Sequence, residues 1–145
     1  MTGVLDGLVV LDLSQGIAGP ITGMLLADHG ARVTKIEPPG GDPSRALSGS
    51  RVWHRGKRSA FLDLDDARDR EQVVALASVA DVVLESFGPG GAARVGLDHA
   101  SLQERNPRLV ACSITGYGDL EQHADRVAID ALVAARTGHQ WESRG

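Results

Sequence analysis

A run of basic side chains between Pro43 and Leu62 is the feature of this sequence with the clearest chemical meaning. That interval contains no Asp or Glu, and its residues that carry or can carry positive charge are Arg45, Arg51, His54, Arg55, Lys57 and Arg58. Such a cluster is typical either of a solvated loop or of a site for a small polyanion. The charge pattern alone leaves both interpretations open.

The rest of the chain excludes several classes of partner. Its formal net charge is −4, whereas general nucleic-acid binders usually carry the positive charge that displaces phosphate counterions. No stretch approaches the ~20 apolar residues of a membrane span, and the N-terminus lacks a basic region followed by an apolar one. Cys112 is the single cysteine, so no disulfide can form within the chain. We expect a cytoplasmic protein that binds neither nucleic acid nor membrane.

A glycine-containing turn near the N-terminus loosely resembles a dinucleotide-binding fingerprint. Gly16, Gly19 and Gly23 would let the backbone approach a ligand, and a helix beginning there would offer N–H groups to phosphates. The spacing is not G-x-G-x-x-G, but Glu37 occupies the place where NAD-binding folds carry a ribose-binding acid. NAD binding therefore stays open as an alternative, and tight packing of helix on strand is the simplest use of the glycines.

Other motifs predict neither ATP hydrolysis nor a metal site. The segment Gly56-Lys57-Arg58-Ser59 lacks the spaced glycine of a phosphate-binding loop and leads into a strand rather than a helix. The five histidines have no partner four residues away and no neighbouring cysteine, so we expect no metal site. Cys112 lies in an apolar run and is expected to pack in the core.

The elements that must position these residues alternate between strand and helix. Short apolar runs predict strands at residues 8–13, 32–36, 59–64, 81–87 and 109–114, and helical spacing predicts helices at residues 20–27, 65–80, 101–106 and 129–136. The prolines and glycines after Glu37 predict a long loop that contains the basic run. The alternation predicts an α/β fold: one Rossmann-like domain over residues 1–145, with a parallel sheet and flanking helices. Ligands of such sheets bind beyond the C-terminal ends of the strands.

A series of short motifs covers nearly the whole chain in a fixed order. They are Leu5-Asp6-Gly7, Val10-Leu11-Asp12, Ala18-Gly19-Pro20, residues 26–37, Gly41-Asp42-Pro43-Ser44-Arg45, Lys57-Arg58-Ser59, Leu62-Asp63-Leu64, residues 81–90, Leu97, Asn106-Pro107-Arg108-Leu109 and Thr115-Gly116-Tyr117-Gly118. In order and approximate spacing the series resembles class III CoA-transferases of the CaiB/BaiF class. These include formyl-CoA and carnitine-CoA transferases and α-methylacyl-CoA racemases. The similarity is to the N-terminal portion of these longer enzymes.

The resemblance implies that coenzyme A or acyl-CoA is a substrate, that a carboxylic acid is the other substrate, and that no cofactor is covalently bound. The positions that match the family's CoA contacts are Ile17, Ala18, Pro38, Lys57, Arg58, Ser86, Phe87, Arg94, Thr115 and Tyr117. Phe87 would pack against the adenine, while Lys57, Arg58 and Arg94 would contact phosphates. Full-length relatives form interlocked homodimers, whereas a dimer of this chain would be a simpler contact between exposed apolar surfaces.

Departures from the family pattern bear on activity. Ile17 stands where some transferases have Gln, and Ile129 stands where racemases have a His of the acid/base pair. The aspartate that forms the family's acyl-aspartyl anhydride is expected beyond Gly145. Asp130 is the candidate nucleophile within the chain, although its place at the start of an apolar helical stretch favours N-terminal capping or packing. We therefore expect a CoA-binding chain that is inactive by itself as a transferase or racemase. A noncatalytic CoA- or nucleotide-binding module is the alternative.

Overall fold

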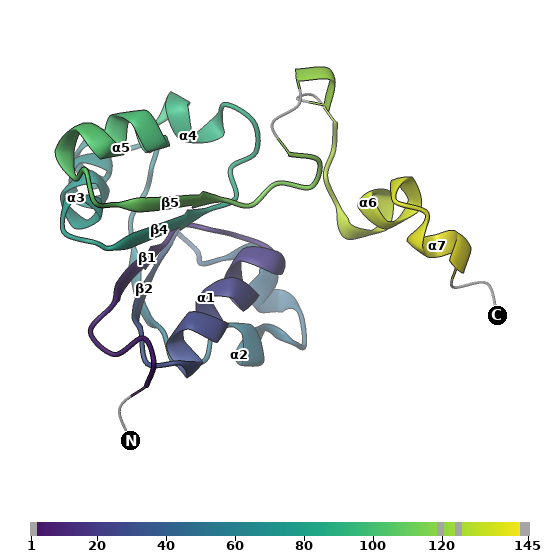
Figure 1. Ribbon diagram of the computed structural model, residues 1–145, viewed down its shortest axis with the longest axis horizontal. Coiled ribbons are helices and arrows are strands. Elements are labelled where there is room, and N and C mark those ends of the chain that lie inside the picture. Colours follow the sequence, from purple (N-terminus) through teal and green to yellow (C-terminus); the bar gives the residue numbers. More distant parts are fainter. Residues whose placement is uncertain (1–2, 119–120, 124–125, 143–145) are drawn as a thin grey trace.

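The computed structural model describes residues 3–118, 121–123 and 126–142. A five-stranded parallel sheet with the strand order β3-β2-β1-β4-β5 runs through it (Figure 1). The strands are β1 (Val9–Asp12), β2 (Arg32–Glu37), β3 (Arg58–Phe61), β4 (Val82–Glu85) and β5 (Val110–Ser113). The predicted Rossmann-like α/β fold is confirmed. The strand order reverses between β1 and β4, which is where such sheets usually bind their ligands.

Helices cover both faces of the sheet (Figure 1). One face carries α1 (Ala18–Asp28) and α2 (Ser50–Trp53), and the other carries α3 (Ala67–Ser78), α4 (Gly91–Arg94) and α5 (His99–Arg105). There are also two short 3-10 helices, η1 (Pro43–Ala46) and η2 (Glu121–His123). The last helices, α6 (Asp130–Arg136) and α7 (His139–Glu142), project away from the sheet. Across the described residues, none of these helices has the length and apolar character needed to cross a bilayer.

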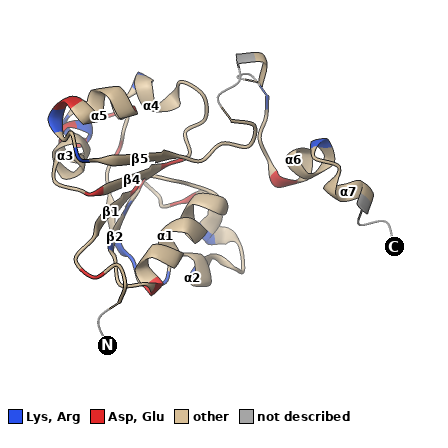
Figure 2. Ribbon diagram, in the orientation of Figure 1, with Lys and Arg blue, Asp and Glu red and all other residues tan. Residues whose placement is uncertain are grey.

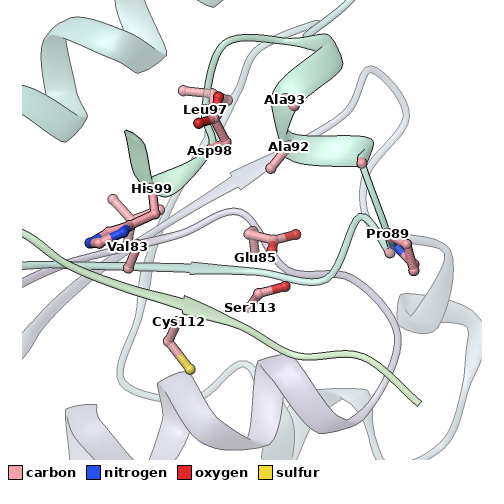
Figure 3. Close-up of a pocket in the computed structure, with 13 residues that line it drawn as sticks. Val83, Glu85, Pro89, Ala92, Ala93, Leu97, Asp98, His99, Cys112 and Ser113 are labelled. Atoms are coloured by element: carbon pink, nitrogen blue, oxygen red, sulfur yellow. The ribbon is translucent and has the colours of Figure 1, made fainter. Parts of the chain in front are cut away.

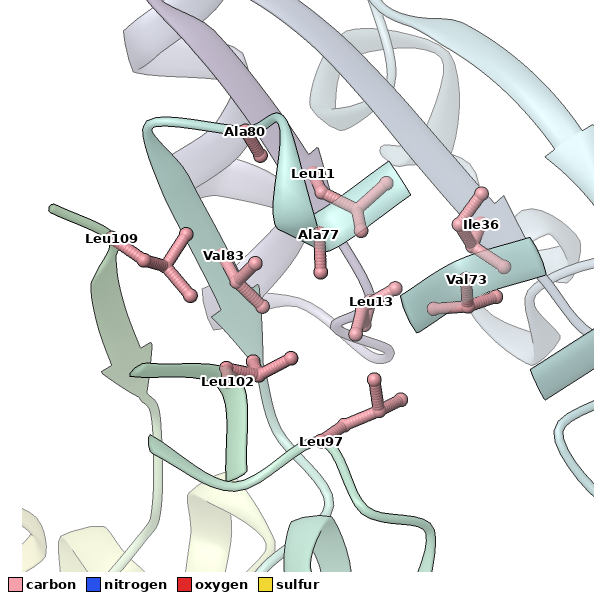
Figure 4. Packing of buried hydrophobic residues seen from close by; sticks show 10 residues of the cluster. All are labelled: Leu11, Leu13, Ile36, Val73, Ala77, Ala80, Val83, Leu97, Leu102 and Leu109. Atoms are coloured by element: carbon pink, nitrogen blue, oxygen red, sulfur yellow. The ribbon is translucent and has the colours of Figure 1, made fainter. Parts of the chain in front are cut away.

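Alternating side chains on the strands build two apolar layers. The larger layer joins the sheet to α3 and α5 (Figure 4) and consists of Leu11, Leu13, Ile36, Val73, Ala77, Ala80, Val83, Leu97, Leu102 and Leu109. The smaller layer lies on the α1 side and consists of Val10, Ala31, Val33 and Leu84. Towards the C-terminal ends of β1 and β2 this second face changes from apolar to charged, because Asp12, Lys35 and Glu37 take the next alternate positions. All three charged side chains are buried.

The boundaries differ from the prediction mainly at turns. Helix α1 begins at Ala18 rather than at Pro20, and Ile17 is its N-cap without a side-chain hydrogen bond. The predicted long loop contains η1 and α2, because Asp42 caps η1 by accepting a hydrogen bond from the Ser44 N–H, with Pro at the first position of η1. Proline at a first helical position has no N–H to leave unpaired, so the segment read as a loop can start a helical turn.

Candidate functional site

A cleft of about 1180 Å³ opens at the C-terminal edge of the sheet, where the fold predicts a ligand. It is lined by parts of the turn between β1 and α1 (residues 15–19), η1 and Leu47, the turn after β4 (residues 86–89), the segment after β5 (residues 114–118) and the region around α6. Typical small-molecule sites have volumes of roughly 300–1,000 Å³. The cleft is therefore large enough for an extended ligand of the size of a dinucleotide or of CoA.

Most of the residues predicted to bind CoA line this one cleft. They are Ile17, Ala18, Ser86, Phe87, Arg94, Thr115 and Tyr117, and Asp130 joins them from α6. Pro38 lies instead in a neighbouring cavity of about 160 Å³ between the ends of β1, β2 and β3. Gln15 lines both spaces, so the cavity of Pro38 adjoins the cleft at the β1–α1 turn.

Lys57 and Arg58 do not line the cleft. The Lys57 side chain is only 2% exposed, and its Nζ donates hydrogen bonds to Asp12 Oδ2 at 2.6 Å and to the Pro20 carbonyl at 2.7 Å. Burial lowers the pKa of Lys57, although the attraction of Asp12 acts in the opposite direction. Arg58 is exposed on the edge strand β3, outside the lining of the cleft. The geometry therefore supports a phosphate contact for Arg94 but not for these two residues.

Three cations of the basic run are paired with acids of the fold, which leaves them less available to a polyanion. Arg45 contacts Glu37 at 2.5 Å, and Arg55 contacts Asp28 at 2.5 Å. Together with Lys57 and Asp12, these pairs join the run to acids from β1, α1 and β2. Much of the segment thus balances charge within the fold.

Ser86 supports the β1–α1 turn as well as lining the cleft. Its hydroxyl accepts a hydrogen bond from the Gln15 N–H at 2.8 Å and lies 3.3 Å from the Gln15 carbonyl, to which it can donate. Within the same turn, Gly19 leaves no room for a side chain, since a Cβ there would lie 2.2 Å from Ser14 Cβ. The turns after β1 and β4 are thereby held together, and both present backbone to the cleft.

The segment after β5 forms the opposite wall. The Tyr117 hydroxyl donates to the Val127 carbonyl at 3.4 Å, and the Tyr117 ring meets His123 edge-on with centroids 5.8 Å apart. Gly116 packs so closely on Ala128 that a Cβ there would be 2.5 Å from the Ala128 Cβ. These contacts attach residues 126–142, hereafter the C-terminal arm, to the turn after β5.

Asp130 is not the helix cap that its position in the sequence suggested. Ile129 occupies the N-cap of α6, and Asp130 lies within the first turn, where a carboxylate complements the helix dipole. The side chain is exposed on the cleft and has no hydrogen bond or ion pair with a described residue. Figure 2 shows the acidic start and basic end of α6, with uncharged residues between them.

Comparison with known proteins shows the family to which the chain belongs. CoA-transferase family III matches residues 5–142, nearly the whole chain. The chain belongs to this family. It is 40% identical to the probable fatty acyl-CoA transferase Rv3272 of Mycobacterium tuberculosis over 92% of this chain and 37% of that protein. It is also 40% identical to the succinate–glutarate CoA-transferase of Agrobacterium fabrum over 92% of this chain and 38% of that enzyme. A solved structure of Rv3272 superposes with a TM-score of 0.90 at 41% identity, covering 95% of this chain and 40% of that one.

This family III chain therefore spans well under half the length of the relatives it matches, and it corresponds to their N-terminal part. The alternative of NAD binding depended on Glu37 as the acid that binds a ribose, and the structure does not support that role. Glu37 is buried and accepts hydrogen bonds from Arg45 Nε, the Ser59 hydroxyl and the Asp42 N–H. Its carboxylate is thus occupied inside the fold, so it is not placed to bind a ribose.

Two parts of the site were not identified from the sequence of this family III chain. Arg126 lines the cleft, is exposed, and has no ion pair with a described residue. The buried charges at the ends of β1 and β2 were also missed. The sequence does contain a pattern that indicates these buried charges, because charged residues alternate with buried apolar ones on two adjacent strands. No comparable pattern distinguishes Arg126.

A smaller cavity of about 270 Å³ lies between β4, β5 and α4 (Figure 3). Glu85 and Ser113 point into it, whereas Cys112 points to the opposite side of the sheet. There Cys112 packs against the smaller apolar layer, as expected. Glu85 Oε2 accepts the Phe87 N–H at 2.7 Å, so this carboxylate steadies the turn that carries Phe87.

Glu37 should make the fold sensitive to acid. The hydrogen bonds from Arg45, which outweigh the opposing effect of burial, lower the pKa of Glu37 from 4.5 to about 2, with help from Ser59 and the Asp42 N–H. A lowered carboxyl pKa contributes stability above the unfolded value, and this stability is lost as the pH falls from about 4.5 towards 2. The contribution is about 3 kcal/mol at neutral pH. Urea unfolding from pH 7 to pH 3 should show this loss, and Glu37→Gln should abolish that part of it. Equal pH dependence in the two proteins would contradict the role of Glu37.

Proposed function

We propose that this chain binds the CoA portion of an acyl-CoA in the cleft and serves as the CoA-holding part of an enzyme that transfers CoA between an acyl-CoA and a carboxylic acid. The observation that carries the proposal is that Ile17, Ala18, Ser86, Phe87, Arg94, Thr115 and Tyr117 line one cleft. These positions come from three separate turns of the chain. The membership of family III supports the reaction class.

The lining suits the chemistry of CoA. Arg94 and Arg126 are exposed cations without ion pairs to described residues, and guanidinium groups bind phosphate oxygens in bidentate fashion. Phe87 offers an aromatic face on which an adenine can stack, beside Arg94 in the same wall. Pro38 would contact a part of the extended ligand that reaches past Gln15 into the neighbouring cavity.

In the proposed reaction, an aspartate attacks the thioester carbonyl and CoA thiolate leaves, which gives a mixed anhydride. The acceptor carboxylate then attacks the donor acyl carbon and releases the aspartate, which gives a mixed anhydride of donor and acceptor. The CoA thiolate attacks the acceptor's carbonyl carbon in this anhydride, which forms the new thioester and releases the donor carboxylate. The described residues of the cleft include a single carboxylate, Asp130. The part that we assign to this chain is therefore to bind and orient CoA, and a noncatalytic CoA-binding module stays the second candidate.

Arg94→Ala tests the proposed function. Titration calorimetry should show CoA binding to the unmodified chain and roughly tenfold weaker binding to the variant, because one charged hydrogen-bonding partner of phosphate is lost. The affinity of the variant should also depend less on salt, since one screened ion pair is missing. Arg58→Ala is the matched control, because Arg58 is an exposed arginine outside the cleft. Absence of CoA binding by the unmodified chain, or equal losses in the two variants, would contradict the proposal.

A further inference from the structure

One buried ammonium group joins two neighbouring segments of the cleft lining. Lys35, on β2, is 1% exposed, and its Nζ donates a hydrogen bond to the Ser14 carbonyl at the start of the β1–α1 turn. The same Nζ lies 3.0 Å from Asp42 Oδ2. Asp42 in turn caps η1 by accepting the Ser44 N–H at 2.8 Å. A single side chain thus connects two segments that both line the cleft.

Further buried charges hold each of these segments in place. Asp12 accepts hydrogen bonds from the Ser14 N–H and hydroxyl, and Lys57 ties Asp12 to the first turn of α1 at the Pro20 carbonyl. On the η1 side, Glu37 accepts the Asp42 N–H at 2.9 Å and the Arg45 guanidinium. We call this set the ion network; its members are Asp12, Lys35, Glu37, Asp42, Arg45 and Lys57.

The ion network contains equal numbers of acids and bases, and its charges are matched in space. A buried ion pair adds little stability compared with apolar side chains of similar volume, because the cost of removing two charges from water offsets their attraction. The better-attested use of such a pair is to specify one arrangement of the groups that it joins. In this structure those groups are the β1–α1 turn and η1.

We propose that Lys35 is a positioning residue for CoA: it does not touch the ligand, but it holds the β1–α1 turn and η1, two neighbouring parts of the cleft lining, at a fixed distance from each other. Lys35 is absent from the cleft lining, whereas Ile17, Ala18, Pro43 and Ser44 belong to it. A site held by a well-packed supporting shell binds more tightly than one whose walls can drift apart. This inference rests on the proposed binding of CoA in the cleft.

The double variant Lys35→Met/Asp42→Asn tests the proposal, because it removes one charge of each sign and leaves the ion network neutral. Calorimetry should give roughly tenfold weaker CoA binding, the scale seen when supporting contacts of preorganised sites are removed. The salt dependence of binding should match that of the unmodified chain, since no phosphate contact is lost. Asp42→Asn alone should reproduce most of the loss, and the two changes should not add, because both break the same contact.

Val73→Ala is the control for a general loss of stability, because Val73 is fully buried on α3, on the face of the sheet away from the ion network. Urea unfolding would show its destabilisation, while its CoA affinity should equal that of the unmodified chain. If the unmodified chain binds CoA and the double variant binds it equally well, the positioning role is wrong. It is also wrong if Val73→Ala weakens binding as much as the double variant does. If the unmodified chain itself does not bind CoA, the proposed function fails, and the inference fails with it.

Discussion

Replacing Lys57 with methionine should lower the free energy of unfolding by about 3–5 kcal/mol, the usual cost of removing one partner from a buried ion pair. Asp12 is 0% exposed, and its Oδ2 would lose the ammonium that lies 2.6 Å away. The Pro20 carbonyl would lose a donor at the same time. Urea unfolding at pH 7 measures the effect directly.

Two comparisons make this prediction specific. Arg55→Met removes a cation from an ion pair whose side chains are 47% and 34% exposed, so it should cost no more than about 1 kcal/mol. The double variant Lys57→Met/Asp12→Asn leaves no uncompensated charge, keeps an oxygen that accepts from Ser14, and should recover much of the stability lost in Lys57→Met. Similar small losses for Lys57→Met and Arg55→Met would show that the Lys57 ammonium reaches water in solution.

A polypeptide of residues 1–145, purified alone, should form no acyl-enzyme even when it binds acyl-CoA. Removing the nucleophile of a covalent mechanism lowers turnover by roughly a millionfold in the best-studied case, and what remains comes from binding alone. Incubation with radiolabelled acyl-CoA and hydroxylamine measures this, because hydroxylamine converts an acyl-aspartyl anhydride into a hydroxamate. We expect no label above that in a CoA-free control.

Asp130 is the residue that could contradict this expectation. Its side chain is exposed on the cleft and has no hydrogen bond or ion pair with a described residue, so the carboxylate is available to react. The matched variant is Asp130→Asn, which preserves shape and removes the nucleophilic charge. Hydroxamate that forms with the unmodified chain and disappears in Asp130→Asn would place the nucleophile within this chain.

The sheet was predictable because its strands are short apolar runs bounded by glycine, proline or acidic residues. Val9–Asp12, Val82–Glu85 and Val110–Ser113 lie within the ranges expected from the sequence, whereas β2 and β3 extend one residue beyond theirs, at Glu37 and at Arg58. The glycine-rich turns after β1 and β4 lie at the C-terminal edge of the sheet, where a ligand was expected to bind. The helical segments η1 and α2 were not predicted, because their formation depends on the Asp42 cap and on packing rather than on an apolar period.

The sequence could not distinguish the two interpretations of the basic run, for a physical reason. The partners of Lys57, Arg55 and Arg45 lie 45, 27 and 8 residues away along the chain, outside the acid-free interval from Pro43 to Leu62. Parallel pairing of β1 with β2 and of β2 with β3 brings Asp12 and Glu37 close to the run, and α1 supplies Asp28. Charge along a sequence therefore indicates a binding surface only when the cross-strand neighbours are considered.

The C-terminal arm gives the cleft two walls of different character. The edge formed by the turns after β1 and β4 is anchored to the sheet, whereas no residue of α6 is buried. Under the proposed function, the anchored edge holds the part of the substrate that is common to every acyl-CoA. Helix α6, which contributes none of the proposed phosphate contacts, then faces the part that differs from one acid to another. Exchange of residues on α6 would change which acid is accepted while the grip on CoA is kept, so the two properties would be free to evolve separately.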